Sequence, residues 1–192
     1  MRRILSCFGI LIGVVIVLVL LLVGGVYFSA QLKLESRFNN PLDTFTVDKS
    51  PARVARGQLL VSSVPGCVGC HASNPQATPP LLNGAQVKDA EAFGFIWAPN
   101  LTPGGQLKDY SDAELERAVR EGISREGRPL AIMPSGDFAN LSDIDMQDII
   151  AYLRSQPSDN QADRATSYSA LAYALLGLNQ VPLSNGPPVS NV

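Results

Sequence analysis

The run Cys67-Val68-Gly69-Cys70-His71 constrains this chain more than any other feature, because His71 is the only histidine among its 192 residues. A Cys-x-x-Cys-His run is typical of the place where a c-type haem is attached. The two thiols form thioethers to the edge of the haem, and the adjacent imidazole reaches the iron. A single histidine can supply one imidazole, so any second protein ligand of the iron is a different kind of residue.

Two other chemistries use a Cys-x-x-Cys pair. A redox dithiol is expected in a strand–helix–strand context, which this sequence does not show. A zinc site needs four ligands, and no second Cys/His pair follows in the chain. The motif therefore favours one covalently bound haem c, with Cys67 and Cys70 as the attachment points and His71 as the proximal ligand of the iron.

Methionine is the soft side chain best suited to the opposite side of the iron, and the chain contains Met1, Met133 and Met146. Met146 falls in register with the apolar residues of an expected helix, which is typical of a core position. Met133 lies in a loop between Pro129 and Pro134, whose rings stiffen the segment and lower the entropy lost when it is fixed near a metal. We predict Met133 as the distal ligand, with an open or water-bound position as the alternative.

An almost uninterrupted apolar stretch follows Arg2 and Arg3, from about residue 7 to residue 28. As a helix it covers roughly 33 Å, enough to cross a hydrocarbon core of about 30 Å. A cleavable signal has a shorter apolar region and small residues at its exit. We therefore predict an uncleaved, single-pass transmembrane anchor over residues 1–30. The positive-inside rule then places the remainder on the periplasmic side of a bacterial cytoplasmic membrane.

The charge balance excludes one class of partner. The net charge is −2, and all 17 acidic residues come after the apolar stretch. A mildly acidic exported part argues against nucleic acid binding, which depends on Lys and Arg contacts to phosphate. The net charge does not identify a redox partner, because electrostatic steering of a partner depends on local patches of charge.

The sequence beyond the anchor divides into three parts. Residues 31–50 are predicted to form a connector, residues 51–157 one domain, and residues 158–192 a C-terminal extension. Within the extension, residues 168–178 are apolar but too short to span a bilayer. This segment could dock on the domain, lie in the membrane interface or meet a partner subunit, and we expect the tail, 184–192, to be disordered.

Three helices are predicted in the domain. The first covers residues 51–64 and has proline at its first helical position, where the missing N–H costs nothing. The second begins after Ser111, with Glu114 completing a capping box and Gly122 suited to the C-terminal cap. The third begins after Ser142 and ends before Pro157. The loops between them are rich in Pro, Gly and Asn, and loops of this kind can line a flat disc such as a haem.

This pattern resembles the class I cytochrome c family over residues 51–157. The shared features are a helix leading into Cys-x-x-Cys-His, a methionine-bearing loop and a closing helix. The segments Ala98–Pro103 and Tyr110–Leu115 are similar to haem modules of bacterial membrane-associated cytochrome c proteins, including the cytochrome subunits of periplasmic alcohol and sugar-acid dehydrogenases. The resemblance implies an all-α, class I cytochrome c-like haem domain behind the N-terminal transmembrane helix. It also implies that Gly57 meets the closing helix near Tyr152.

The resemblance further implies residues around the haem. In this family a proline carbonyl after the motif orients the proximal imidazole, and Pro79 or Pro80 is the candidate here. Trp97, Asn100 and Arg128 are candidate contacts for the haem propionates.

Ligation by His71 and Met133 would raise the reduction potential and leave no open position on the iron. This suits an electron carrier rather than an enzyme. We expect a membrane-anchored monohaem cytochrome that passes single electrons between a dehydrogenase or quinol-oxidising complex and a downstream acceptor, such as a terminal oxidase. The alternatives are a haem enzyme or gas sensor with a vacant sixth position, a thiol-redox or metal-binding protein with free cysteines, and a structural subunit of a larger complex.

Overall fold

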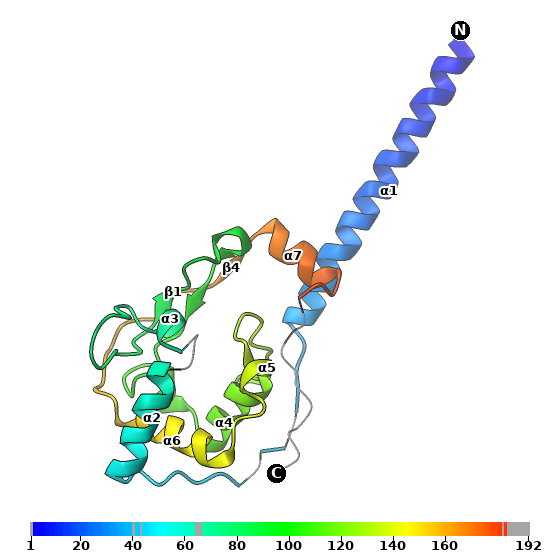
Figure 1. The fold of residues 1–192 in the computed structure, drawn as a ribbon. Helices are drawn as coiled ribbons and strands as arrows, with labels where there is room; N and C mark the ends of the chain where they lie inside the picture. The colour runs from blue at the N-terminus through cyan, green and yellow to red at the C-terminus, as the bar shows by residue number, and fades with distance from the viewer. Residues whose placement is uncertain (1, 40, 43, 64–66, 182, 184–192) are drawn as a thin grey trace.

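The computed structural model describes residues 2–39, 41–42, 44–63, 67–181 and 183. One long N-terminal helix projects from a small, mostly helical domain (Figure 1). The helices are α1 (Arg2–Leu34), α2 (Pro51–Ser63), α3 (Cys67–His71), α4 (Asp112–Glu121), α5 (Ser135–Phe138), α6 (Asp143–Ser155) and α7 (Ala170–Gly177). Between them lie the 3-10 helices η1 (Glu91–Phe93) and η2 (Gln106–Asp109) and the short strands β1 (Ala85–Gln86), β2 (Gly94–Phe95), β3 (Trp97–Ala98) and β4 (Ser167–Tyr168).

Helix α1 is, among the residues that the structure describes, the only helix long and apolar enough to cross a bilayer, over Ser6–Leu34. Its large apolar side chains are exposed along most of its length. The helix continues past residue 30, the predicted end of the anchor, and its last turns pack against α7, where Ala30 is fully buried.

Helices α2 and α6 approach each other closely at Gly57 of α2, which has no side chain. A Cβ on Gly57 would lie 1.8 Å from the backbone oxygen of Asp148 and 2.9 Å from the Cβ of Tyr152. This confirms the predicted contact of Gly57 with the closing helix. The buried Asp148 carboxylate also pairs with Arg53 at 2.9 Å and with Arg56 at 3.2 Å, so charge reinforces the crossing.

The predicted ends of α4 and α6 are confirmed. The Ser111 hydroxyl accepts a hydrogen bond from the Glu114 N–H, and the Glu114 carboxylate accepts one from the Ser111 N–H. Gly122 closes α4 in the left-handed conformation, with φ of 66°. The Ser142 hydroxyl caps α6 by accepting from the Asp145 N–H. Side chains satisfy the backbone donors that a helix start leaves free.

The core lies where α2, α4 and α6 meet the loop after α3. Its largest fully buried apolar side chains are Val61, Leu82, Leu107, Met146 and Ile150. Met146 has no exposed surface, which confirms that it is a packing residue of α6.

The C-terminal extension returns over the domain and then meets α1. Its first part, residues 158–169, is called the C-terminal strap here. In β4 the strap pairs antiparallel with β2, with Tyr168 opposite Gly94. Helix α7 then packs beside the end of α1 (Figure 1), where Lys33 Nζ donates to the Leu176 carbonyl at 2.6 Å. Of residues 168–178, the first two therefore contact the domain, whereas α7 packs mainly against α1, and residues 184–192 lie outside the described residues.

The connector after α1 also contacts the domain. The Phe38 N–H donates to the Gly127 carbonyl, and the Arg37 guanidinium donates to the Glu126 carbonyl, each at 2.9 Å. Both acceptors belong to the loop that follows α4. The end of α1 is thus joined to the domain by the connector as well as by α7.

Candidate functional site

An apolar cavity of about 280 Å³ lies inside the domain. Apolar side chains from the helices and from the loop segments line most of it, among them Val61, Leu82, Ile96, Leu115, Phe138 and Ile149. Cys67, Cys70, His71 and Met133 line the same cavity. The structure therefore brings together the four residues that the sequence predicts around the haem.

The cysteines belong to the single short helix α3. Residues three apart lie on one face of a helix, so Cys67 and Cys70 point to the same side. Burial raises the pKa of the Cys67 thiol to about 11, with the nearby Cys70 contributing, and burial raises the pKa of Cys70 as well. Reactive dithiols instead have a lowered pKa. In the described ranges, moreover, no three His, Cys, Asp or Glu side chains gather to hold a metal ion.

The His71 imidazole is oriented by a backbone carbonyl. Its Nδ1 lies 2.9 Å from the Pro99 oxygen. Since a carbonyl can only accept, Nδ1 carries the proton and the Nε2 lone pair is available to a metal. Burial lowers the pKa of His71, which favours the neutral ring, although the Pro99 hydrogen bond and the Asp163 charge oppose this effect.

The prediction of Pro79 or Pro80 as the orienting residue was wrong, although the kind of group was right. The chain after α3 loops back, and β1 pairs with β3 with Ala85 opposite Ala98. This pairing places Pro99, and not an earlier proline, beside His71. The Pro80 carbonyl instead accepts from the Tyr152 hydroxyl at 3.4 Å.

Met133 lies in the loop between α4 and α5 and is partly buried. The Ser135 N–H donates to the Met133 carbonyl at 2.8 Å, which closes a turn ahead of α5. On the other side of the loop, the Leu130 N–H donates to the Gly122 carbonyl at 2.7 Å. Backbone bonds on both sides therefore fix the segment that presents the thioether to the cavity.

The donor set fits a covalently attached haem. Two thiols on one helix face, an imidazole nitrogen with a free lone pair and a thioether sulfur all line one apolar cavity. An apolar lining suits the faces of a macrocycle, and imidazole with thioether is a known pair of axial ligands for haem iron.

Comparison with known proteins decides the family. The sequence model of cytochrome c matches residues 54–157, which is just over half of the chain. This chain belongs to the cytochrome c family. The cytochrome is an electron-transfer protein that carries covalently bound haem c, one group for its single Cys-x-x-Cys-His motif.

Three curated relatives resemble the cytochrome over 104 to 110 residues. A subunit of the nicotinate dehydrogenase of Pseudomonas putida is 36% identical over 56% of this chain and 9% of its own length. The gluconate 2-dehydrogenase cytochrome c subunit of Pantoea cypripedii is 34% identical over 53% of this chain and 22% of its own. The cytochrome c subunit of the quinone-dependent alcohol dehydrogenase of Gluconacetobacter polyoxogenes is 32% identical over 56% of this chain and 22% of its own length. The cytochrome thus matches less than a quarter of each relative.

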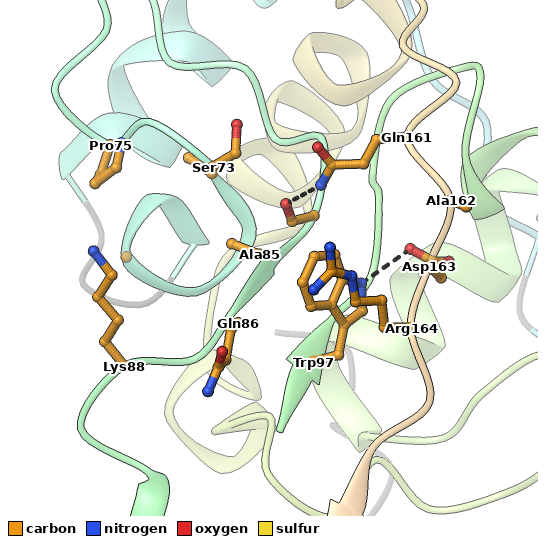
Figure 2. A pocket seen from close by; sticks show the side chains of 13 residues that line it. Ser73, Pro75, Ala85, Gln86, Lys88, Trp97, Gln161, Ala162, Asp163 and Arg164 are labelled. Carbon is orange, nitrogen blue, oxygen red and sulfur yellow. Dashed lines mark hydrogen bonds between the residues drawn. The ribbon is translucent and has the colours of Figure 1, made fainter. Parts of the chain in front are cut away.

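The three candidate propionate contacts lie in different surroundings. Trp97 lines the apolar cavity and also a second, more polar pocket of about 520 Å³ (Figure 2). Its Nε1 donates to the Asp163 carboxylate at 3.4 Å, and the Arg164 guanidinium lies over its ring, 5.0 Å from the centroid. Trp97 therefore forms part of the wall between the apolar cavity and the C-terminal strap.

The structure does not bring Asn100 or Arg128 to the apolar cavity within the described ranges. The fully buried Asn100 amide donates to the Asp159 and Gln161 carbonyls at 2.8 and 3.0 Å, so it fixes the strap instead. Arg128 is half-exposed and lies 3.7 Å from the Glu35 carboxylate near the end of α1. No local pattern in the sequence signals either pairing, because the partners lie about 60 and 90 residues away.

Proposed function

We propose that this cytochrome is a membrane-anchored, single-electron carrier on the periplasmic side of a bacterial cytoplasmic membrane. Cys67 and Cys70 tether its haem, His71 is the proximal ligand and Met133 the distal one. The observation that carries the proposal is that an oriented imidazole and a methionine loop line one apolar cavity. When bound, the haem supplies an iron centre that gains and loses one electron.

The side chains of the cavity do three things in this proposal. The bond from His71 Nδ1 to Pro99 holds the ring so that Nε2 can act as a ligand. Met133 supplies a soft donor, which favours the reduced iron and raises the potential. Ligation by both residues would leave no open position on the iron for oxygen or a substrate, and the apolar lining keeps water from the site, so the site is suited to electron transfer.

Anchoring is proposed from α1. The helix has an apolar span over Ser6–Leu34, and two arginines precede that span. The positive-inside rule then puts the haem domain on the outer side of the membrane. Because α7 and the connector both join the domain to the end of α1, the haem would stay close to the membrane surface.

The electron donor is proposed from the relatives. Two of them are named as cytochrome subunits of dehydrogenases for gluconate and alcohol. We propose a dehydrogenase as the donor, with a quinol-oxidising complex as the alternative, and a downstream acceptor such as a terminal oxidase.

The covalent attachment is tested by denaturing electrophoresis with haem staining of protein made together with haem-maturation machinery. The wild type should retain the stain, and Cys67→Ser with Cys70→Ser should lose it. Cys7→Ser is the matched control, because Cys7 is exposed on α1 and should not affect attachment. A wild-type protein that releases its haem on denaturation would contradict the proposal.

The donor is tested in membranes of the source bacterium by following the visible absorption of the cytochrome. Addition of an alcohol or a sugar acid should reduce the haem if a dehydrogenase is the donor. Reduction by added quinol, blocked by an inhibitor of quinol oxidation, would select the alternative. If neither addition reduces the haem, the proposed electron path is incorrect.

A further inference from the structure

One peptide group links the proximal histidine to a carboxylate. The Pro99 carbonyl accepts from His71 Nδ1 at 2.9 Å, and the Asn100 N–H donates to Asp163 Oδ1 at 2.7 Å. That carbonyl and that N–H belong to the same planar amide, whose resonance couples the oxygen to the nitrogen. An acceptor on the N–H side therefore increases the negative charge on the oxygen and strengthens the bond on the other side.

The Asp163 carboxylate is held in place for this contact. The same oxygen accepts from Trp97 Nε1 at 3.4 Å, and the Arg164 guanidinium stacks on the Trp97 ring (Figure 2). The strap on either side is also fixed, because the Gln161 amide donates to the Gly84 carbonyl at 2.7 Å and the Thr166 hydroxyl accepts from the Trp97 N–H at 3.0 Å. The Asn100 side of the contact is fully buried, whereas Asp163 itself is exposed.

We propose that Asp163 is a positioning residue that lowers the reduction potential of the haem by acting on His71 through the Pro99–Asn100 peptide. The proposal rests on the proposed function, in which His71 is the proximal ligand. A stronger bond from Nδ1–H makes an imidazole a more basic ligand, and a more basic ligand favours oxidised iron. Asp163 thus opposes the effect of Met133, so the strap contributes to the potential at which this carrier works.

The main variant is Asp163→Asn, which keeps an oxygen acceptor for the Asn100 N–H but removes the charge. The matched control is Asp159→Asn, on the same strap. The Asp159 carboxylate accepts from the Asn83 amide and the Gln161 N–H and does not contact the Pro99–Asn100 peptide. Both variants therefore remove one negative charge from the strap, but only Asp163→Asn removes it beside the Pro99–Asn100 peptide.

Two measurements are made on the haem-loaded, full-length protein. A redox titration at low and high salt gives the midpoint potential. Proton–nitrogen NMR of the reduced protein, labelled with nitrogen-15 in histidine, gives the His71 Nδ1–H resonance. That resonance has no competitor within the chain, because no other histidine is present.

We expect Asp163→Asn to raise the midpoint potential by an amount that changes the ratio of reduced to oxidised protein roughly twofold or more at fixed ambient potential. The rise should persist at high salt, which screens charge acting through solvent. The His71 Nδ1–H resonance should move upfield, as expected for a weaker hydrogen bond. Asp159→Asn should change both readings less, and Asp163→Glu, which keeps the charge, should return both towards wild type.

The proposed action of Asp163 on His71 is wrong if Asp163→Asn leaves the His71 resonance unmoved. It is also wrong if the shift in midpoint potential caused by Asp163→Asn equals that of Asp159→Asn and disappears at high salt. If Asp163→Asn does not fold, Asp163→Glu decides the question, since its potential and resonance should stay nearer to wild type than those of Asp163→Ala. Failure of the proposed function is seen separately, because the wild type would then lack attached haem or show no signal of a ligated histidine.

Discussion

Met133 and Met146 differ in their surroundings, and the difference separates the proposed ligand from a packing residue. Met146 has no exposed surface and packs among the apolar residues of α6. Met133 lies in a loop that hydrogen bonds fix on both sides and lines the cavity with His71. A thioether presented on a fixed loop loses less conformational entropy on binding iron than one on a free loop.

We expect Met133→Ala to abolish the iron–sulfur charge-transfer band of the oxidised protein, because no other described methionine lines the cavity. The reduced variant should then bind carbon monoxide rapidly, while the wild type should not. Met146→Leu is the matched control and should keep the band, since it changes only a packed side chain. Rapid binding of carbon monoxide by the wild type would instead support a haem enzyme or a gas sensor.

The residues of the proposed haem site show which kind of site residue a sequence reveals. Cys67, Cys70 and His71 lie within five consecutive residues, and a local motif defines them. Pro99 reaches His71 only because β1 pairs with β3, and Asp163 comes from a strap 63 residues beyond Asn100. Contacts of this kind depend on the path of the chain, which no local pattern encodes.

At the scale of secondary structure elements, the domain depends on the crossing of α2 and α6. The crossing is close because Gly57 has no side chain, and Asp148 pairs there with two arginines from α2. These helices carry much of the core that surrounds the cavity. A change at the crossing should therefore affect stability before it affects the chemistry of the haem.

Gly57→Ala should destabilise the domain by about 3 kcal/mol, because its Cβ would meet backbone atoms that cannot move aside without separating the helices. Gly136→Ala is the matched control, since a Cβ there would have nothing within 4 Å. It should change stability by less than about 1 kcal/mol. Denaturant unfolding of the haem-loaded protein measures both, and equal midpoints for the two variants would show that the crossing tolerates a side chain.

The element scale also shows what sequence patterns can predict. Ser111, Glu114, Gly122 and Ser142 determine helix ends through bonds within a few residues, and those ends were predicted correctly. The packing of the end of α1 against α7 was not predicted, because α7 comes from a distant part of the chain. Local capping chemistry is visible in a sequence, whereas support from a distant element is not.

At the scale of the whole molecule, two attachments join the haem domain to α1. On one side α7 packs against the helix, and Lys33 donates to the carbonyl of Leu176. On the other side the connector bonds to the loop after α4 through Arg37 and Phe38. A domain joined at two points has less freedom to turn than one on a single flexible linker. The two attachments should therefore present one fixed face of the domain to redox partners.

The attachment through α7 is tested by Gly177→Ala, because a Cβ there would lie 2.2 Å from the Val26 carbonyl oxygen. Gly25→Ala, whose Cβ would meet nothing within 4 Å, is the matched control. Spin labels replace the exposed Leu32 on α1 and Leu59 on α2, in a Cys7→Ser background with the haem reduced. Pulsed electron resonance should give a narrow distribution of label distances in the unsubstituted protein and the control, and a broader one in Gly177→Ala. A distribution that Gly177→Ala leaves unchanged would show that the connector alone fixes the domain, and that α7 contributes nothing to its orientation.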